Sequence, residues 1–126
     1  MTDKVVDACA LAAILFGEPQ SENMLARLDG HRLFAPSLLP YEIASIARKK
    51  LRLYPDMRAT ILDAIDRFDR MDITFEAVPP DQALLVAAEF GITTYDACYL
   101  WLSRVQNAEL VTLDKLLQRA ATGEDL

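Results

Sequence analysis

The feature that most constrains this chain is the alternation of short apolar runs with longer stretches that have helical spacing. The run Val5–Val6 is too short to predict a strand by itself, but the helical stretch with Leu11, Ile14 and Leu15 that follows it supports one. Strands that alternate with helices are typical of a parallel sheet covered on both faces, because a parallel connection needs a long crossover. We therefore predict an α/β fold whose strands are Val5–Val6, Leu33–Ala35, Ile73–Val78 and Glu109–Leu113.

The helices are predicted to fill the stretches between these strands. Gly17 and Gly91 follow the last apolar residues of two such stretches, where glycine commonly ends a helix. No linker, internal repeat or low-complexity segment interrupts the pattern, so we expect a single domain over residues 1–126 with a short polar tail at 122–126. The expected helices are one ending at Gly17, then 21–28, 38–51, 56–71, 80–90, one opened by 93–96, and one that begins at Asp114.

The composition fits a globular protein with its own core. Hydrophobic residues make up 52% and charged residues 25% of the sequence, a balance that disordered chains do not have. No apolar run approaches the ~18 residues that a membrane-spanning helix needs, so no membrane partner is expected. Because a strand begins almost at the first residue, we expect no signal peptide and a cytoplasmic location.

The two cysteines and the single histidine offer little for metal or thiol chemistry. Cys9 and Cys98 are expected to be small, buried and reduced. Only His31 could join them in a zinc site, and structural zinc usually takes about four ligands. His31 itself is expected to be exposed in a loop. Glycine-rich phosphate-binding motifs are absent, since the four glycines are not clustered.

Charge is distributed unevenly along the chain. The net charge of −6 disfavours non-specific attraction to nucleic acid. The segment 48–58 nevertheless carries five basic residues and one acid, a local charge of +4. Two interpretations stay open, namely a solvated helix end whose cations suit the helix dipole, or a surface that contacts the phosphates of RNA. The candidate contacts are Arg48, Lys49, Lys50 and Arg52.

Four acids stand at comparable places in the predicted fold. Asp7 and Asp114 directly follow strands, and Glu42 and Asp96 lie in the first turns of helices. Each acid alone has an ordinary explanation, as a helix cap or as a first-turn anion that suits the dipole. Together they are predicted to converge, because right-handed crossovers bring strand ends and the following helix starts to one edge of a parallel sheet.

Four carboxylates in one cleft predict a bound divalent cation. Unpaired acids this close would repel one another, and some would take up protons. Ligands that are all oxygen suit Mg²⁺ or Mn²⁺ rather than zinc or copper. Such ions can activate a water and stabilise a leaving oxygen, which is the chemistry of phosphodiester hydrolysis.

Four stretches around these acids form a recognisable pattern. They are Val5–Ala8 with Leu11 and Phe16–Pro19, Pro36–Glu42, Thr93–Ala97, and Leu110–Asp114. In this order and spacing they resemble the PIN-domain nucleases and, within them, the VapC-type toxins of bacterial type II toxin–antitoxin pairs. No single stretch is specific, but together they span nearly the whole chain.

The resemblance implies an α/β/α sandwich with a parallel sheet of four strands, or five, in an order near 3-2-1-4. It also implies an endoribonuclease that depends on Mg²⁺ or Mn²⁺, usually forms a homodimer and is inhibited by a small antitoxin protein. By position, Asp7, Glu42, Asp96 and Asp114 match the metal-binding acids of the family, and Thr112 matches a residue beside the site.

The chain departs from the family pattern in two places, and two other functions are to be weighed against the leading one. Cys9 stands where the family usually has Ser or Thr, so a hydroxyl interaction near the metal is expected to be absent or weakened. The chain also ends soon after the last helix, which leaves little room for a fifth strand.

An inactive binding module would have the same fold. A phosphatase of the haloacid-dehalogenase type would want a second acid at position 9, which disfavours that function.

Overall fold

Four parallel strands form the sheet at the centre of the computed structural model, which describes residues 2–123. The strands are β1 (Asp3–Val6), β2 (Arg32–Pro36), β3 (Ile73–Glu76) and β4 (Glu109–Val111). Their order is β3-β2-β1-β4, the order that the resemblance implied. β1 is therefore paired on both sides: Val5 pairs with Phe34 of β2 and with Leu110 of β4.

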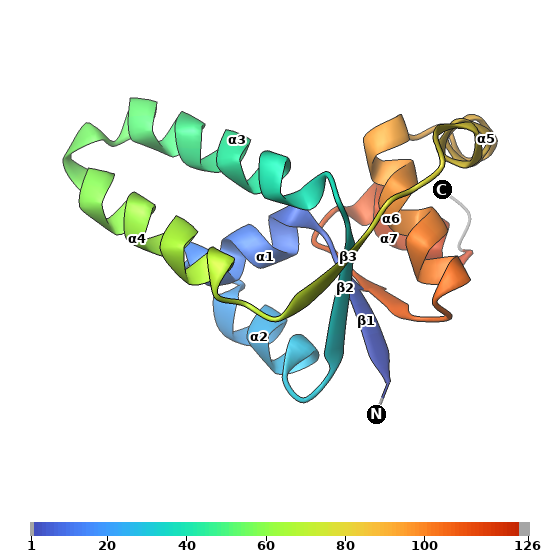
Figure 1. Ribbon diagram of the computed structural model, residues 1–126, viewed down its shortest axis with the longest axis horizontal. Helices are drawn as coiled ribbons and strands as arrows, with labels where there is room; N and C mark the ends of the chain where they lie inside the picture. Colours follow the sequence, from blue (N-terminus) through green and yellow to red (C-terminus); the bar gives the residue numbers. More distant parts are fainter. Residues whose placement is uncertain (1, 124–126) are drawn as a thin grey trace.

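Helices cover both faces of this sheet and make three layers (Figure 1). They are α1 (Ala8–Leu15), α2 (Ser21–Leu28), α3 (Leu39–Leu53), α4 (Arg58–Asp69), α5 (Pro80–Phe90), α6 (Thr94–Val105) and α7 (Lys115–Thr122). The first four helices lie on one face and the last three on the other, and α3 and α4 form a long pair that extends beyond the sheet (Figure 1). The fold is the expected α/β/α sandwich.

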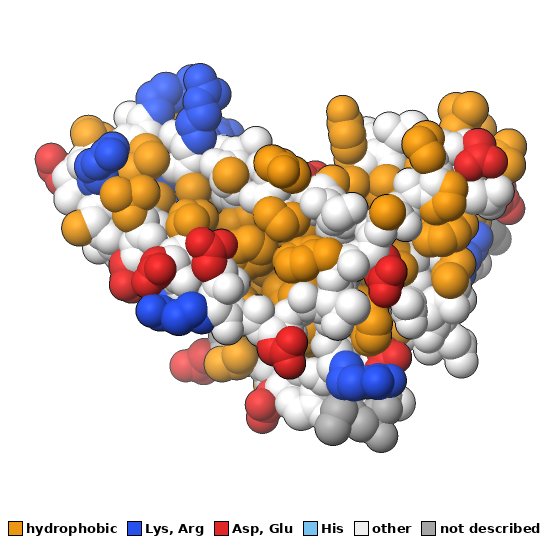
Figure 2. Space-filling view, in the orientation of Figure 1, with side chains coloured by type: hydrophobic (Ala, Val, Ile, Leu, Met, Phe, Trp, Pro, Cys, Tyr) orange, Lys and Arg blue, Asp and Glu red, His pale blue; other side chains and the backbone are white. Residues whose placement is uncertain are grey.

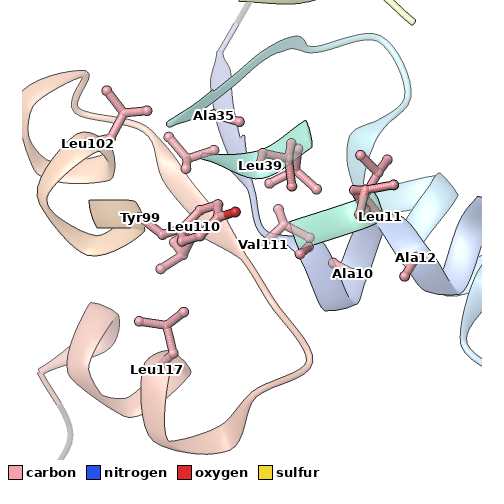
Figure 3. Packing of buried hydrophobic residues seen from close by; sticks show 14 of the residues in the cluster. Ala10, Leu11, Ala12, Ala35, Leu39, Tyr99, Leu102, Leu110, Val111 and Leu117 are labelled. Atoms are coloured by element: carbon pink, nitrogen blue, oxygen red, sulfur yellow. The ribbon is translucent and has the colours of Figure 1, made fainter. Parts of the chain in front are cut away.

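The core lies where the two helical layers meet the inner strands. Val5 and Val6 of β1 are both fully buried, although neighbouring side chains of a strand point to opposite faces of the sheet. Figure 3 shows the buried side chains around these strands, which include Leu11 of α1 and Leu117 of α7. Because this end of β1 is covered on both faces, its last two residues, Val5 and Val6, are both apolar.

Two strands are shorter than the apolar runs that predicted them. β3 stops two residues early, because its neighbour β2 ends at Pro36, which pairs with Glu76. β4 stops at Val111, opposite Val6, where β1 ends and the chain turns into α1. The helix expected over 56–71 is likewise divided into a 3-10 turn at Pro55–Met57 followed by α4.

The expected burial of the cysteines and the exposure of the histidine are both only partly right. Cys9 and Cys98 are free thiols, as expected, but each is half-buried rather than buried. His31 is half-buried rather than exposed, because its Nδ1 lies 2.8 Å from the hydroxyl of Thr2, next to the start of β1.

The end of the chain adds no strand within the part that the structure describes. Over residues 2–123 the sheet has four strands, and α7 ends at Thr122. The last three residues of the expected polar tail, 124–126, lie outside the described residues. Between residues 2 and 123, no helix is both long enough and apolar enough to cross a membrane.

Candidate active site

The four predicted acids line one pocket of about 390 Å³. Asp7 and Asp114 directly precede α1 and α7, beyond the carboxyl ends of β1 and β4, while Glu42 and Asp96 come from the first turns of α3 and α6. The sheet order changes direction here, because the chain goes from β1 to β2 on one side while β4 lies on the other. Open α/β sheets bind their ligands at such a switch point.

Asp7 is the most buried of the four, with 5% of its surface exposed. It caps α1, since its Oδ1 accepts a hydrogen bond from the Ala10 backbone N–H at 3.0 Å. The Thr112 hydroxyl donates to Oδ2, and Cys9 Sγ lies 3.1 and 3.2 Å from the two carboxylate oxygens. Burial raises the pKa of Asp7, and these hydrogen bonds oppose the rise. Capping therefore accounts for only part of what surrounds this carboxylate.

Thr112 connects Asp7 to the acid that follows β4. Its hydroxyl donates to Asp7 and accepts a hydrogen bond from the Asp114 backbone N–H at 3.0 Å. Asp114 in turn caps α7, because its Oδ1 accepts from the Leu117 backbone N–H at 3.0 Å. Thr112 is buried, so water does not compete easily for its hydroxyl. The residue that was expected beside the site thus contacts one of the acids directly.

Glu42 is half-buried and is held by a tyrosine from the opposite helical layer. The Tyr99 hydroxyl donates to Glu42 Oε1 at 2.5 Å. Burial raises the pKa of Glu42, the hydrogen bond from Tyr99 lowers it, and the charges of Asp96 and Asp7 raise it again. The phenol itself has a raised pKa, first because it is buried and then because it faces Glu42. It therefore stays a hydrogen-bond donor to the acid.

Asp96 is not a helix cap, although capping was one explanation for it in the sequence. The cap of α6 is Thr93, whose hydroxyl oxygen accepts a hydrogen bond from the Asp96 backbone N–H at 3.0 Å. Burial raises the pKa of the Asp96 carboxyl, and the charge of Asp114 raises it further. Capping therefore does not explain this half-buried acid in the pocket.

The electrostatics of the pocket favour a cation. Among the described residues that line it there is no Lys or Arg, and three of its acids have raised pKa values because burial and like charges penalise ionisation. Within residues 2–123, no group of three or more His, Cys, Asp and Glu side chains stands ready to hold a metal ion. It is the chemistry of the donors, four carboxylates around one cavity, that fits a hard divalent ion such as Mg²⁺ or Mn²⁺.

Sequence reasoning missed two polar residues that line the pocket, Tyr99 and Ser45. Each follows a predicted acid by three residues, Tyr99 after Asp96 and Ser45 after Glu42, and residues at this spacing share a helix face. That spacing was the signal that could have found them.

Cys9 also lines the pocket, and its interaction with the site is weakened rather than absent. The thiol donates to Asp7, where a weaker donor takes the place expected for a hydroxyl group. Burial and the charge of Asp7 raise the pKa of Cys9 to about 11, so it remains a thiol at neutral pH. A thiol donor in place of a hydroxyl fits the expectation that this interaction is absent or weakened.

The basic residues lie along the outer half of α3 and do not line the acidic pocket. Figure 2 shows Lys and Arg side chains gathered over that end of the molecule. Arg48, Lys49 and Arg52 are exposed. Lys50 is half-buried, and its Nζ lies 5.0 Å from the centre of the Phe16 ring. One of the four candidate RNA contacts is thus turned toward the body of the protein.

Comparison with known protein families agrees with this site. The family described as the PIN domain matches residues 4–123, which is nearly the whole chain. The chain belongs to the PIN-domain family. This PIN domain is also 31% identical over 118 residues to Ribonuclease VapC3 of Pyrobaculum aerophilum, a match that covers 90% of each chain. That similarity places it with the VapC group of the family.

The fold of this PIN domain is also similar to a solved structure. The crystal structure of PAE2754 from Pyrobaculum aerophilum superposes with a TM-score of 0.78 at 27% sequence identity. The match covers 98% of this chain and 88% of the other. Sequence and fold comparisons therefore support the same three-layer arrangement.

Proposed function

We propose that this PIN domain is a metal-dependent endoribonuclease that acts as the toxin of a type II toxin–antitoxin pair. The pocket itself carries the proposal: four carboxylates from four parts of the fold line one cavity, and no basic residue of the described chain lines it with them. Raised pKa values at three of them are typical of functional sites rather than of surface acids. The name of the VapC3 relative, a ribonuclease, supports the same reaction.

In this proposal Asp7, Glu42, Asp96 and Asp114 hold Mg²⁺ or Mn²⁺. When bound, the ion supplies a water of lowered pKa and neutralises charge on the leaving oxygen of the phosphodiester. The hydroxyl group of Thr112 keeps the Asp7 carboxylate in one orientation. Asp96 and Asp114 raise the negative potential of the pocket, which attracts the cation in the first place.

The outer surface of α3 suits the phosphates of RNA. At about 100° per residue, Lys49 lies two turns beyond Glu42 on the same side of the helix, and Arg52 lies about one turn further. RNA that reaches the pocket would pass along this side. Arg48 lies beside it, whereas Lys50 points toward Phe16 and is the least suited of the four predicted contacts.

A protein inhibitor is the second proposed partner, in keeping with the VapC group. An acidic pocket attracts Arg or Lys, so a basic side chain of the antitoxin would displace the metal ion. A separate cavity of about 600 Å³ lies between α1 and the α3–α4 pair and is lined by apolar groups such as Ile14, Phe16 and Ile61. It suits the apolar part of the same partner.

The homodimer and the cytoplasmic location also stay proposals. Leu84 and Leu85 of α5 are 60% and 63% exposed, and Figure 2 shows hydrophobic side chains gathered over this helix. Neighbouring exposed leucines on one helix are a common mark of an interface. We propose that a second copy of the chain covers them.

The experiment that tests the proposed activity compares two aspartates in equivalent positions. Asp96 and Asp81 both lie in the first turn of a helix, but only Asp96 lines the pocket. With Mn²⁺, the wild-type protein and Asp81→Asn should cleave RNA. Asp96→Asn should lose at least about 100-fold in rate, because even hydrogen-bond partners of metal ligands typically contribute 10–100-fold. Expression of the wild type alone should also arrest growth.

Equal cleavage by all three proteins would exclude the pocket as the active site. No cleavage by any of them, together with no stabilisation by Mn²⁺, would instead favour the inactive binding module. If the wild type is stabilised by Mn²⁺ but cleaves no RNA, the proposed metal site stands and the proposed RNA substrate is wrong.

A further inference from the structure

Tyr99 joins the two helical layers at the acidic pocket. α3 packs against α1 and α4 on one face of the sheet, whereas α6 packs against α5 on the other (Figure 1). The hydrogen bond from the Tyr99 hydroxyl to Glu42 Oε1 crosses between these layers. Figure 3 shows the hydroxyl pointing away from α6, toward the side on which Leu39 of α3 lies.

Glu42 is held by fewer hydrogen bonds than Asp7, the other acid of the pocket whose carboxylate receives hydrogen bonds from side chains. Among residues 2–123, the Tyr99 hydroxyl is the one hydrogen-bond donor to the Glu42 carboxylate. Asp7 instead receives hydrogen bonds from Thr112, Cys9 and the Ala10 backbone. Fixing a glutamate side chain in one conformation also costs more conformational entropy than fixing an aspartate side chain. Within the described part of the chain, no other donor would hold the Glu42 carboxylate in one orientation if this bond were lost.

Tyr99 is well placed to hold Glu42 still, because its ring is fixed in the core. The residue is 1% exposed and belongs to the main cluster of buried hydrophobic side chains. It lies one turn after Asp96 on the same face of α6, so this helix supplies one acid and also the group that holds the acid opposite. The bond engages Oε1 and leaves Oε2 free to face a ligand.

We propose that Tyr99 is a positioning residue that orients Glu42 for metal binding across the two layers of the fold. The inference rests on the proposed function, because the orientation of Glu42 matters only if the pocket binds the ion. It assigns a task to a side chain whose ring would otherwise be counted as ordinary core. Tyr99 acts through Glu42 and needs no contact with metal or RNA.

The test removes one oxygen atom and measures metal binding without RNA. Tyr99→Phe should weaken Mn²⁺ binding about 10-fold or more, the effect typical of losing a hydrogen-bond partner of a metal ligand. Calorimetry or electron paramagnetic resonance measures the dissociation constant, and circular dichroism checks that the variant is folded. Tyr95→Phe is the matched control, because Tyr95 lies in the same helix but is 64% exposed; it should bind Mn²⁺ like the wild type.

A double-mutant cycle separates positioning from a general effect on folding. In a Glu42→Ala background, Tyr99→Phe should no longer change the dissociation constant for Mn²⁺, because the group through which Tyr99 acts is gone. An equal loss in both backgrounds would mean that Tyr99 only supports the core, and the inference would be wrong. The cycle uses ratios between folded variants, so it remains informative if Tyr99→Phe lowers the melting temperature.

The outcome for the wild type distinguishes the two proposals. If the wild type binds Mn²⁺ and cleaves RNA while Tyr99→Phe binds equally well, the proposed function stands and the positioning role is wrong. If the wild type binds no Mn²⁺, the proposed function fails and the positioning role fails with it.

Discussion

The Thr112 hydroxyl donates a hydrogen bond to the Asp7 carboxylate, although the two residues are 105 positions apart in the chain. The same oxygen accepts a hydrogen bond from the backbone N–H of Asp114. One small side chain therefore links the acid that follows β1 to the acid that follows β4. This link lies beside the pocket, where the sheet order changes direction between β1 and β4.

Thr112→Val should destabilise the protein, because it keeps the shape of the side chain but removes a donor to a buried carboxylate. An unsatisfied buried group of this kind costs about 1–3 kcal/mol in the free energy of unfolding, and urea denaturation measures that change. Thr112→Ser keeps the hydroxyl and should retain most of the stability. Equal stability of the Val and Ser variants would show that the hydrogen bond is unimportant.

The stability of the metal-free protein should fall as the pH rises above about 4. Asp7, Glu42 and Asp96 have raised pKa values in the folded protein, so the folded state binds more protons than the unfolded state. Their stabilising effect is fully present below the ordinary pKa of about 4 and is lost as the pH rises through the raised values. Glu109, whose pKa is lowered chiefly by Lys4, acts in the opposite direction at acidic pH.

Urea denaturation over a series of pH values, with EDTA or with Mn²⁺, checks this dependence. The metal ion binds the ionised carboxylates, so the stability that it adds should increase with pH. A metal-free protein that becomes steadily more stable from weakly acidic to neutral pH would contradict the account of the pocket.

Reversing the charge of the exposed cations on α3 should weaken RNA binding without changing metal binding. Lys49→Glu or Arg52→Glu should raise KM for RNA. Each variant should also reduce the slope of the logarithm of the binding constant against the logarithm of the salt concentration, by about one for each phosphate that it no longer neutralises. Lys50→Glu should have a smaller effect, because Lys50 lies over Phe16. Filter binding at several salt concentrations measures these slopes, and equal slopes for all three variants would contradict the proposed RNA path.

Cys9 should react slowly with iodoacetamide in the folded protein near neutral pH. Burial and the charge of Asp7 raise its pKa to about 11, and the thiolate is the reactive form. Mass spectrometry of native and urea-unfolded protein should show slow modification in the first and ordinary modification in the second. Modification of native Cys9 at the rate of a free small thiol would mean that burial and the charge of Asp7 do not raise its pKa.

The arrangement of the acids was predictable because it follows from chain topology. A short apolar run that is followed directly by Asp7 or Asp114 places a carboxylate beyond the end of a strand. Parallel strands with crossovers bring those ends together. Predicting this arrangement did not require knowledge of individual side-chain contacts. The order of the strands came from the family resemblance.

The hydrogen bonds that hold the acids were not predictable in the same way. Tyr99 lies among apolar residues of α6, so its pattern in the sequence is that of a core residue. Whether Thr93 or Asp96 caps α6 depends on which residue has an extended backbone, and the structure gives that conformation to Thr93. The hydrogen bond from Cys9 to Asp7 depends likewise on the turn from β1 into α1.

The central claim is that the four acids bind a divalent cation, and anomalous scattering from crystals soaked in Mn²⁺ tests it most directly. We predict an anomalous peak in the pocket, bonded to carboxylate oxygens from the set Asp7, Glu42, Asp96 and Asp114, which is absent from crystals of Asp96→Asn grown and soaked in the same way. Well-ordered wild-type crystals with no peak in the pocket, or with Mn²⁺ bound only elsewhere, would contradict it.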